Sequence, residues 1–567
     1  MSLASFSYIA TKERLAGTRW LGVGVIATIH LAAIGILAWT EYDWVGPAIF
    51  VLGWGMLNFA FIALLRRPAI SAALSLCLFV AVVMLSQLKF SVLWMVINFF
   101  DVLIVDSDTV AFLLSIFPDL RVMIVIGVLI VVPALVLIWR YPFRVRRSVA
   151  LFGAAACSIA ITVWALAVPE EPWEQFQGIN HVSTFIRSGV TTAYELTTKG
   201  WIDFDTLTSD QLRVAADEPC HLSGKPPNII MVLDEASFDA SVVPGVKLPP
   251  GYGGHFRSFD GKTRSLFVEG SGGPTWYTEY NVLTGLSARS YGRLSYYVTR
   301  IAAGRVERGL PRALHRCGYK TISLYPAYGA FLSAKKFQQT AGVGRFVDSA
   351  EMKAKDFAPD SFYFGKALKM IESEQGDQPL FIMVYTMFNH FPWWNVLKPE
   401  LTPDWRPLGN DPQLDEYLRR QTLSARNYAD FKQRLATDFP GKPFLVVRFG
   451  DHQPGMAQII DPSATEEMIA QRIMSYDPRY FTTYYAIDGV NFRPKDISSA
   501  LDRLEAPYLP IVVQEAAGVP LDPSFAEQKK ILERCHGLFF QCAGGAEVRR
   551  FNRLLIDAGL IKGMVSR

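Results

Sequence analysis

Five long apolar stretches in the first 170 residues restrict this part of the chain to a membrane. They lie near residues 20–40, 47–65, 70–88, 121–139 and 148–168. Each has roughly the 17–25 residues that a helix needs to cross a bilayer. Half of all residues are hydrophobic and 19% are charged, which is few charges for a soluble protein. The sequence therefore predicts a domain of five transmembrane helices over residues 1–168.

The loops between these stretches differ in charge, and this predicts their orientation. Basic residues occupy the segment before the first stretch and two later loops: Lys12, Arg14, Arg19, Arg66, Arg67, Arg140, Arg144, Arg146 and Arg147. The alternate loops carry acids instead: Glu41, Asp43, Asp101, Asp106 and Asp108. We therefore expect a multi-pass protein of the inner (cytoplasmic) membrane. Its amino terminus is expected in the cytoplasm, and everything after about residue 169 outside it.

Residues 89–118 do not fit a sixth span, because three aspartates interrupt them and carboxylates are costly at mid-membrane. We interpret this stretch as an interfacial or re-entrant segment. Two roles stay open, a loop that packs on the helices and a groove that receives a lipid.

Residues suited to catalysis follow three further apolar runs and one glycine-rich turn. The four segments are residues 228–235 (NIIMVLDE), 270–275 (GSGGPT), 380–390 (LFIMVYTMFNH) and 444–454 (FLVVRFGDHQP). Open α/β sheets build their sites at the carboxyl ends of buried parallel strands. Together the segments supply a carboxylate, a hydroxyl, an imidazole and an Asp-His pair, a ligand mixture that Zn²⁺ or Mn²⁺ accepts. Each segment alone is more often structural; in combination they predict a metal-assisted nucleophile site.

The order of these segments resembles that of the lipoteichoic acid synthase and periplasmic-glucan phosphoglycerol transferase family, within the alkaline phosphatase/sulfatase superfamily. The resemblance also covers Thr278-Glu279-Tyr280 and Leu283-Thr284-Gly285. It implies an α/β sulfatase-like extracytoplasmic catalytic domain over residues 226–515, with a C-terminal extension over 516–567. Residues 169–225 then form a linker. Its residues 182–196 have a helical apolar stripe that we expect to pack on the catalytic domain, with the bilayer surface as the alternative.

The resemblance also assigns roles within the site. Thr275 is the expected nucleophile, with Thr278 as the rival. Glu235, Thr275, Asp451 and His452 are the expected ligands of one divalent metal, Mn²⁺ or Zn²⁺. His390 is expected to bind phosphate and to protonate a leaving alkoxide, while Asp234 is either structural or an outer partner of a ligand.

The chain departs from the lipoteichoic acid synthases at one place. Leu332 and Ala334 stand where those enzymes carry Trp and Arg, and Lys335 or Lys336 would have to supply the missing charge. This favours decoration of another acceptor over polyglycerolphosphate synthesis. Trp276 and Trp393 are candidates for stacking on sugars, with core packing as the alternative.

The resulting hypothesis is an enzyme of the cell envelope, a phosphoglycerol transferase that modifies a glycan. It moves the head group of a phospholipid, expected to be phosphatidylglycerol, to an extracytoplasmic glycan through a phosphothreonine intermediate. A phosphoethanolamine transferase, a metal-dependent phosphodiesterase and a sulfatase-type hydrolase are the alternatives. The sulfatase is disfavoured because no C/S-x-P-x-R segment follows Glu235. No nucleic-acid partner is expected.

The six cysteines divide between the two regions. Cys77 and Cys157 lie in predicted spans and are expected to be free. Cys535 and Cys542 enclose a short loop outside the membrane, where disulfides persist, and we predict that they are bridged. Pairing of Cys220 with Cys317 stays open at this point.

Overall fold

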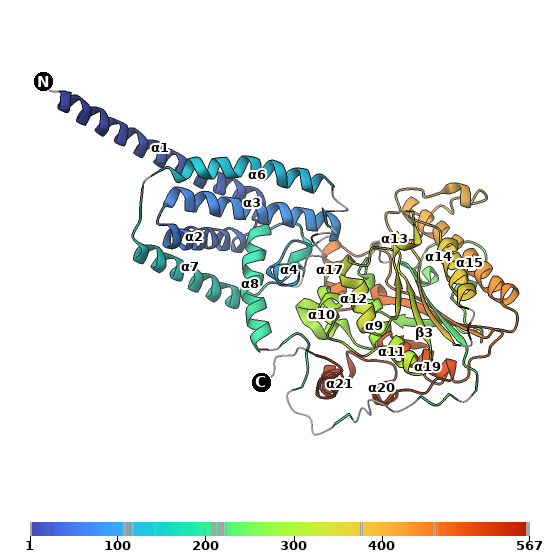
Figure 1. Ribbon diagram of the computed structural model, residues 1–567. Helices are drawn as coiled ribbons and strands as arrows, with labels where there is room; N and C mark the ends of the chain where they lie inside the picture. The colour runs from blue at the N-terminus through green and yellow to red at the C-terminus, as the bar shows by residue number, and fades with distance from the viewer. Residues whose placement is uncertain are drawn as a thin grey trace. The chain divides into compact units, whose positions relative to one another are not determined.

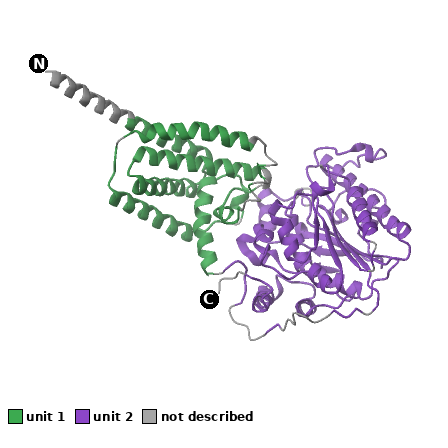
Figure 2. Ribbon diagram, in the orientation of Figure 1, with its two compact units in different colours: residues 1–198 green, residues 199–567 purple. Residues whose placement is uncertain are grey.

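The computed structural model describes residues 3–562 with short gaps at 94, 106–109, 111–112, 115–117, 142, 172, 199, 206–210, 213–219, 223, 356, 375, 377, 457–460 and 462. For residues 3–21 it describes the backbone alone. The chain forms two compact units, residues 1–198 and residues 199–567 (Figure 2).

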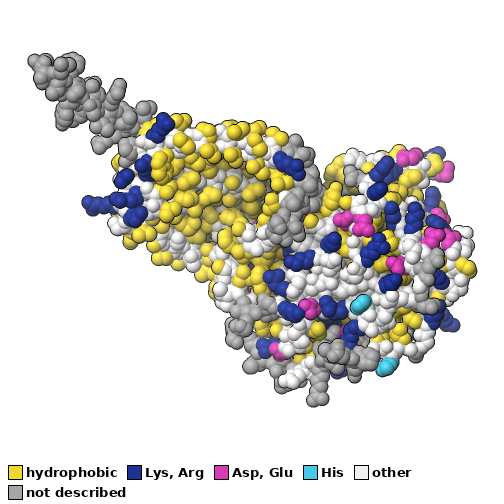
Figure 3. All heavy atoms as spheres, viewed as in Figure 1, with side chains coloured by type: hydrophobic (Ala, Val, Ile, Leu, Met, Phe, Trp, Pro, Cys, Tyr) yellow, Lys and Arg dark blue, Asp and Glu magenta, His cyan; other side chains and the backbone are white. Residues whose placement is uncertain are grey.

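The first unit is helical (Figure 1). Its elements are α1 (Leu3–Thr40), α2 (Val45–Leu65), α3 (Pro68–Leu93), α4 (Phe99–Ile104), α6 (Pro118–Trp139), α7 (Arg147–Ala167), η1 (Glu174–Phe176) and α8 (His181–Thr198). Among the residues that the structure describes, five segments are long and apolar enough to cross a membrane: Gly22–Thr40, Val45–Leu65, Pro68–Ser91, Leu120–Trp139 and Arg147–Ala167. Hydrophobic side chains cover the face of this unit seen in Figure 3. The five predicted apolar helices are confirmed.

Helix α8 contains the predicted apolar stripe but packs differently from our expectation. Val182 lies in a buried cluster with Phe50 of α2 and with Phe79 and Val83 of α3, so α8 belongs to the first unit. Ile186, from the same stripe, also packs against this cluster. The first unit therefore continues to residue 198, beyond the boundary expected at 168.

The segment expected to be interfacial contains α4, which begins after Asn98. Asp101 accepts a hydrogen bond from the backbone N–H of Asn98 at 2.9 Å and forms an ion pair with Lys89 at 2.7 Å. Pairing reduces the cost of placing both charges among apolar helices. Asp106 and Asp108 lie outside the described residues, and the interfacial role of residues 89–118 stays a prediction.

The second unit is built on one eight-stranded sheet of order β4-β3-β5-β1-β6-β7-β2-β8. The strands are β1 (Asn228–Asp234), β2 (Arg264–Phe267), β3 (Lys320–Leu324), β4 (Arg345–Val347), β5 (Leu380–Tyr385), β6 (Phe444–Gly450), β7 (Thr482–Val490) and β8 (Arg503–Glu505). Strands β4, β3, β5, β1 and β6 are parallel, and β7 runs antiparallel to both of its neighbours. The three apolar runs singled out in the sequence are thus the adjacent central strands β5, β1 and β6.

Helices and 3-10 turns connect the strands. The helices are α9 (Thr275–Thr284), α10 (Val298–Ala302), α11 (Leu310–Arg316), α12 (Ala334–Thr340), α13 (Ser349–Met352), α14 (Asp360–Ser373), α15 (Pro412–Asp438), α17 (Glu466–Met474), α18 (Pro478–Phe481), α19 (Leu509–Ala517), α20 (Pro523–Cys535) and α21 (Ala546–Asp557). The 3-10 turns are η2 (Ala240–Val242), η3 (Tyr252–Phe256), η4 (Ala288–Tyr297), η5 (Phe331–Ser333), η6 (Pro399–Leu401), η7 (Ala506–Tyr508) and η8 (Cys542–Gly545).

Both faces of the central strands are buried, which explains their continuous apolar runs. Ile230 and Val232 of β1 pack with α14 and α15, where Phe364 and Phe431 stack with ring centroids 4.6 Å apart. The alternate residues of β1, Ile229 among them, are fully buried on the other face. The carboxyl ends of β5, β1 and β6 are therefore held in fixed register.

Two disulfides close loops of the second unit. Cys535 is bonded to Cys542, and Cys220 is bonded to Cys317, the pairing that the sequence left open. Cys77 and Cys157 are free, as expected for residues within the spans.

A buried carboxyl group fixes α9 to its neighbours. Gln338 of α12 donates through Nε2 to Glu279 Oε1 at 2.8 Å and to the hydroxyl oxygen of Tyr385 at 2.9 Å. Burial raises the pKa of Glu279 to about 8, against the weaker opposing effect of its hydrogen bonds with Gln338 and with Tyr385. The carboxyl group is therefore protonated at neutral pH in the folded protein.

We predict that Glu279 makes the protein less stable as the pH rises from about 4.5 to about 8. In this range the unfolded chain releases a proton that the folded chain retains, so deprotonation favours unfolding. Glu279→Gln removes this effect, and the Tm of the variant minus that of wild type should increase between pH 5 and pH 8. The measurement is a thermal melt of the full-length protein in detergent. Glu372→Gln, at an exposed position on α14, is the control whose difference should stay constant; the same constancy for Glu279→Gln would contradict the prediction.

Candidate metal and nucleophile site

The candidate site lies where the central strands end. Asp234, the last residue of β1, pairs in register with Gly450, the last residue of β6, so Glu235 and Asp451 follow neighbouring strand ends. The backbone N–H of Glu235 donates to Thr386 Oγ1 at 3.0 Å, just beyond β5. Three chain segments far apart in the sequence are thereby fixed within one small volume.

Gly450 makes this close approach feasible. A Cβ atom at this position would lie 1.8 Å from the carbonyl oxygen of Ser237, well inside van der Waals contact. The glycine therefore lets the segment after β1 pass directly over the end of β6. This is the same glycine that precedes the Asp-His pair in the sequence.

Glu235, Asp451 and His452 form a cluster that could hold a metal ion. All three are buried, and each offers one ligand atom within 4.8 Å of the others. His452 Nε2 lies 3.2 Å from Asp451 Oδ2 and 3.8 Å from Glu235 Oε1. His452 donates through Nδ1 to the carbonyl oxygen of Gln453 at 2.8 Å, so in the neutral ring Nε2 keeps a lone pair directed at the carboxylates.

The two buried carboxyl groups of the cluster would be stabilised by a cation. Asp451 Oδ1 accepts hydrogen bonds from the N–H groups of Ala236 and His452, but the buried Oδ2 accepts none from the described residues. Burial, and then the negative charge of Asp451, raises the pKa of Glu235 well above its usual range. Two buried carboxylates and one imidazole are a donor set that fits Zn²⁺ or Mn²⁺.

Thr275 begins α9 beside this cluster, and its Oγ1 lies 3.3 Å from His452 Nε2. The preceding Gly272 adopts a φ of 73°, and its N–H donates to the carbonyl oxygen of Gln453 at 3.1 Å. A glycine takes this left-handed conformation without strain. The start of α9 also carries the partial positive charge that favours a developing anion.

The rival hydroxyl, Thr278, has a structural role. It is fully buried and donates to the carbonyl oxygen of Asp451 at 2.6 Å. This bond fixes α9 to the segment that contains the Asp-His pair. Thr275, by contrast, is only half-buried, and its hydroxyl lies at the cluster.

His390 follows β5 in a turn of the same end of the sheet. It donates through Nδ1 to the carbonyl oxygen of Phe391 at 2.7 Å, which leaves Nε2 available. Burial lowers the pKa of His390, and the nearby His452 lowers it further. The ring is thus mainly neutral at neutral pH, within electrostatic range of the cluster.

A network that the sequence did not reveal lies behind Glu235. Asp234 accepts hydrogen bonds from His255 at 2.9 Å and from the hydroxyl of Tyr484 at 2.6 Å. Arg448 donates to the carbonyl oxygen of His255 at 2.6 Å and lies over the ring of Tyr428. Although burial opposes it, the hydrogen bond from His255 lowers the pKa of Asp234 below its usual value. Asp234 is therefore an ionised structural residue whose neighbour in the chain is Glu235.

The four residues suggested for substrate binding fall into two groups. Trp276 and Trp393 are buried, and their ring N–H groups donate to the carbonyl oxygens of Tyr296 and Asn389. They pack the core, the alternative kept open above, and do not present a face to a sugar. Lys335 and Lys336 are exposed at the start of α12. This segment reaches Thr275 indirectly, through ring contact of Phe331 with Trp276 at 6.3 Å.

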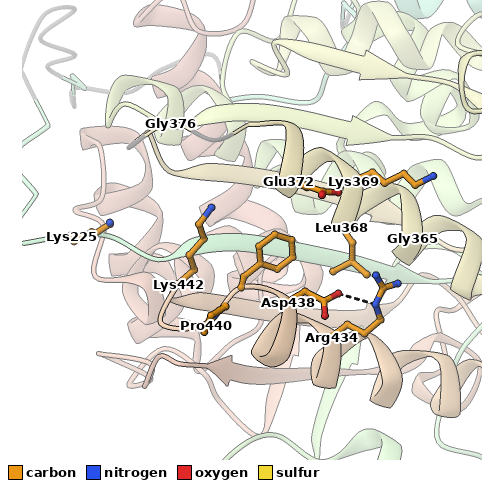
Figure 4. Close-up of a pocket in the computed structure, with 11 residues that line it drawn as sticks. Lys225, Gly365, Leu368, Lys369, Glu372, Gly376, Arg434, Asp438, Pro440 and Lys442 are labelled. Carbon is orange, nitrogen blue, oxygen red and sulfur yellow. Dashed lines mark hydrogen bonds and ion pairs between the residues drawn. The ribbon is translucent and has the colours of Figure 1, made fainter.

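A groove of about 920 Å³ lies at the opposite end of the strands (Figure 4). Its lining includes Lys225 before β1, Lys442 before β6, and Arg434, which is ion-paired with Asp438 at 3.0 Å. Lys225 and Lys442 lie just before the amino ends of β1 and β6, whereas the candidate metal ligands lie just after the carboxyl ends of the same two strands. The groove is therefore separate from the candidate site.

Comparison with known proteins gives one family match. Residues 263–489 match the family model described as Sulfatase, inside the domain expected at 226–515. A protein of Rhizobium meliloti, provisionally named a cyclic beta-1,2-glucan modification protein, is 23% identical over 245 residues, which are 40% of this chain and 36% of that protein. An uncharacterized protein of Haemophilus influenzae is 22% identical over 276 residues, 45% of this chain and 48% of that protein. The matches thus span less than half the length of either relative.

Solved structures of similar fold include two transferases. Streptococcus pyogenes phosphoglycerol transferase GacH, in complex with sn-glycerol-1-phosphate, aligns over 59% of this chain and 85% of its own, with 18% identity and a TM-score of 0.45. The lipooligosaccharide phosphoethanolamine transferase A (EptA) of Neisseria meningitidis aligns over 86% of this chain and 98% of its own, with 13% identity and a TM-score of 0.45.

The family match encloses Thr275, His390, Asp451 and His452, and β1 adds Glu235 to them. With its parallel sheet and its buried cluster of candidate ligands, the unit that contains residues 263–489 resembles the sulfatases of the alkaline phosphatase superfamily, and it follows five apolar helices.

Proposed function

We propose that this protein is a membrane-bound, metal-dependent transferase that moves a phosphoglycerol head group from a phospholipid to an extracytoplasmic glycan. Thr275 is the nucleophile, and a phosphothreonine diester is the intermediate. One observation carries the proposal: a hydroxyl at the start of a helix lies 3.3 Å from the inward-facing nitrogen of a buried Glu-Asp-His cluster.

Glu235, Asp451 and His452, with Thr275, would hold one divalent cation, Mn²⁺ or Zn²⁺. A cation at these residues supplies positive charge next to the Thr275 hydroxyl and the phosphate oxygens. That charge would let Thr275 lose its hydroxyl proton to solvent before the lipid reacts. The Thr275 Oγ1 alkoxide then attacks phosphorus, and the bond from phosphorus to the diacylglycerol oxygen breaks. In the second step an acceptor hydroxyl attacks the same phosphorus, and the bond to Thr275 Oγ1 breaks.

His390 transfers the proton in both steps. Because Nδ1–H donates to Phe391, Nε2 is the atom that exchanges a proton with substrate. The imidazolium protonates the leaving diacylglycerol oxygen, and the resulting neutral ring accepts the proton of the acceptor hydroxyl. The lowered pKa makes the imidazolium a stronger acid, while the negative charge of a bound phosphodiester favours its formation.

Two features support an extracytoplasmic catalytic unit. The basic residues lie in alternate loops of the first unit, and such loops face the cytoplasm in membrane proteins, which supports an outside location for the residues after the fifth span. Both disulfides belong to the second unit. Disulfides persist in oxidising compartments. The provisional name of the Rhizobium relative supports a glycan as the acceptor.

We predict that the full-length protein, incubated with phosphatidylglycerol and quenched, carries glycerol phosphate on the peptide that contains Thr275. Peptide mass spectrometry measures the adduct. Thr275→Val should abolish it, whereas Thr275→Ser should retain it because the hydroxyl remains. An ethanolamine-phosphate adduct, formed only from phosphatidylethanolamine, would instead identify a phosphoethanolamine transferase. Turnover by Thr275→Val at the wild-type rate would exclude the covalent mechanism.

His390→Gln should slow transfer from the lipid by roughly 10²–10⁴-fold, because the leaving alkoxide then lacks its proton donor. Bis-(p-nitrophenyl) phosphate releases a stable phenolate and needs little protonation, so its first-step rate should fall far less. Comparing the two rates separates proton transfer from structural damage. Equal losses with both substrates would contradict the assigned role.

Glu235→Gln and Asp451→Asn should each weaken binding of Mn²⁺ and Zn²⁺. Loss of an outer partner alone costs roughly 10–100-fold in metal affinity, so loss of a ligand should cost at least as much. Titration of chelator-treated protein with each metal gives the affinity, and Asp438→Asn in the opposite groove is the matched control. Wild-type affinity in Asp451→Asn would show that the metal lies elsewhere.

A further inference from the structure

The loop that follows His390 exposes an unusual number of large apolar side chains. Phe391 is 38% exposed, Trp394 63%, Val396 63% and Leu401 38%. Several exposed apolar side chains on one short stretch of chain can mark a binding site. The adjacent Trp393 is buried in the core, so the two neighbouring tryptophans have opposite environments.

The backbone of this loop is held rigidly by buried charges of α15. The Arg420 side chain is wholly buried and donates to the carbonyl oxygens of His390, Pro392 and Asn395, each at 2.7 Å. Glu416 forms an ion pair with Arg420 at 2.6 Å. Burying such charges is costly unless all are paired. Here Arg420 and Glu416 fix the backbone of a loop whose exposed side chains do not pack in the core.

Rings connect the exposed patch to the candidate site. The ring centroids of His390 and Phe391 are 5.5 Å apart, and those of Phe391 and Trp394 are 5.8 Å apart. The patch therefore begins at the side chain to which the proposed mechanism assigns proton transfer. A molecule whose phosphate lies at His390 would extend past Phe391 toward Trp394.

We propose that this apolar loop, residues 391–401, binds the glycerol and acyl portion of the lipid donor at the bilayer surface. The inference rests on the proposed function and adds the element that recognises the donor. Val396 and Leu401 offer neither a flat ring nor a polar group to a sugar, so a lipid fits the patch better than a glycan. Trp394 combines an apolar ring with an N–H donor, as tryptophans at membrane interfaces do. The five apolar helices of the same chain supply the membrane.

Kinetics with two donors test this inference. In nanodiscs, the double variant Trp394→Ser/Val396→Ser should lower kcat/KM for a long-chain phospholipid at least ten-fold. For a soluble donor with the same head group on butanoyl chains, the change should stay below two-fold. Phe259→Ser, at an aromatic residue that is 40% exposed, is the matched control and should change neither value. Equal losses with both donors, or no loss, would overturn the inference. Normal formation of the Thr275 adduct with slower transfer to glycan would overturn it in favour of an acceptor surface.

A spectroscopic measurement tests the contact without relying on turnover. Trp394→Cys, in a chain with Cys77→Ala and Cys157→Ala, is labelled with a nitroxide in nanodiscs. Compared with the same label at Phe259→Cys, it should be more accessible to oxygen and less accessible to a water-soluble nickel complex. A label fully exposed to the nickel complex would overturn the inference. A bilayer-protected label in a protein that forms no adduct from any lipid would instead contradict the proposed function and leave the membrane contact in place.

Discussion

Two buried carboxyl groups, with His452 as their one basic neighbour among the described ion pairs, are central to the arrangement of the second unit. Glu235 and Asp451 follow adjacent strand ends, and burial together with their mutual repulsion raises the pKa of Glu235. Burying two acidic groups side by side is unfavourable unless a positive charge, such as a bound cation, compensates them. The features around them serve this arrangement: Gly450 permits the close approach of the two segments, and His452 Nδ1–H, bonded to a carbonyl oxygen, directs Nε2 inward.

The two threonines of α9 differ in what their hydroxyl groups contact. Thr278 uses its hydroxyl to bond the carbonyl oxygen of Asp451, and this bond positions the helix. Glu279 accepts a hydrogen bond from Gln338 of α12, which fixes the two helices together. Because its carboxyl group is protonated at neutral pH, Glu279 adds no negative charge to the acidic region around Glu235 and Asp451. Thr275 is left at the helix start with its hydroxyl toward His452. A helix anchored by polar bonds on one side can present its first residue with little freedom.

The sequence predicted the candidate site residues that directly follow an apolar strand. It did not predict contacts between residues that are far apart in the chain. Continuous apolar runs predicted β1, β5 and β6, and the residues after β1 and β6 form the cluster that the structure brings together. The network of Asp234, His255 and Arg448 gave no signal, because His255 and Arg448 are 193 residues apart and neither stands in a recognisable pattern. Aromatic residues were equally ambiguous: Trp393 and Trp394 are neighbours, yet only backbone geometry places one in the core and the other in solvent.

A transferase with a covalent intermediate has to accept two chemically different molecules at one phosphorus, one after the other. The donor is apolar beyond its phosphate, whereas a glycan acceptor is polar throughout. The residues near Thr275 offer both kinds of surface: exposed Lys335 and Lys336 in the segment that contacts Trp276, and the apolar loop beyond His390. In the proposed mechanism diacylglycerol departs before the acceptor reacts, so each surface would need to fit one molecule only. A phosphothreonine intermediate, as proposed, would thus allow one small buried site to serve two substrates that share only the transferred group.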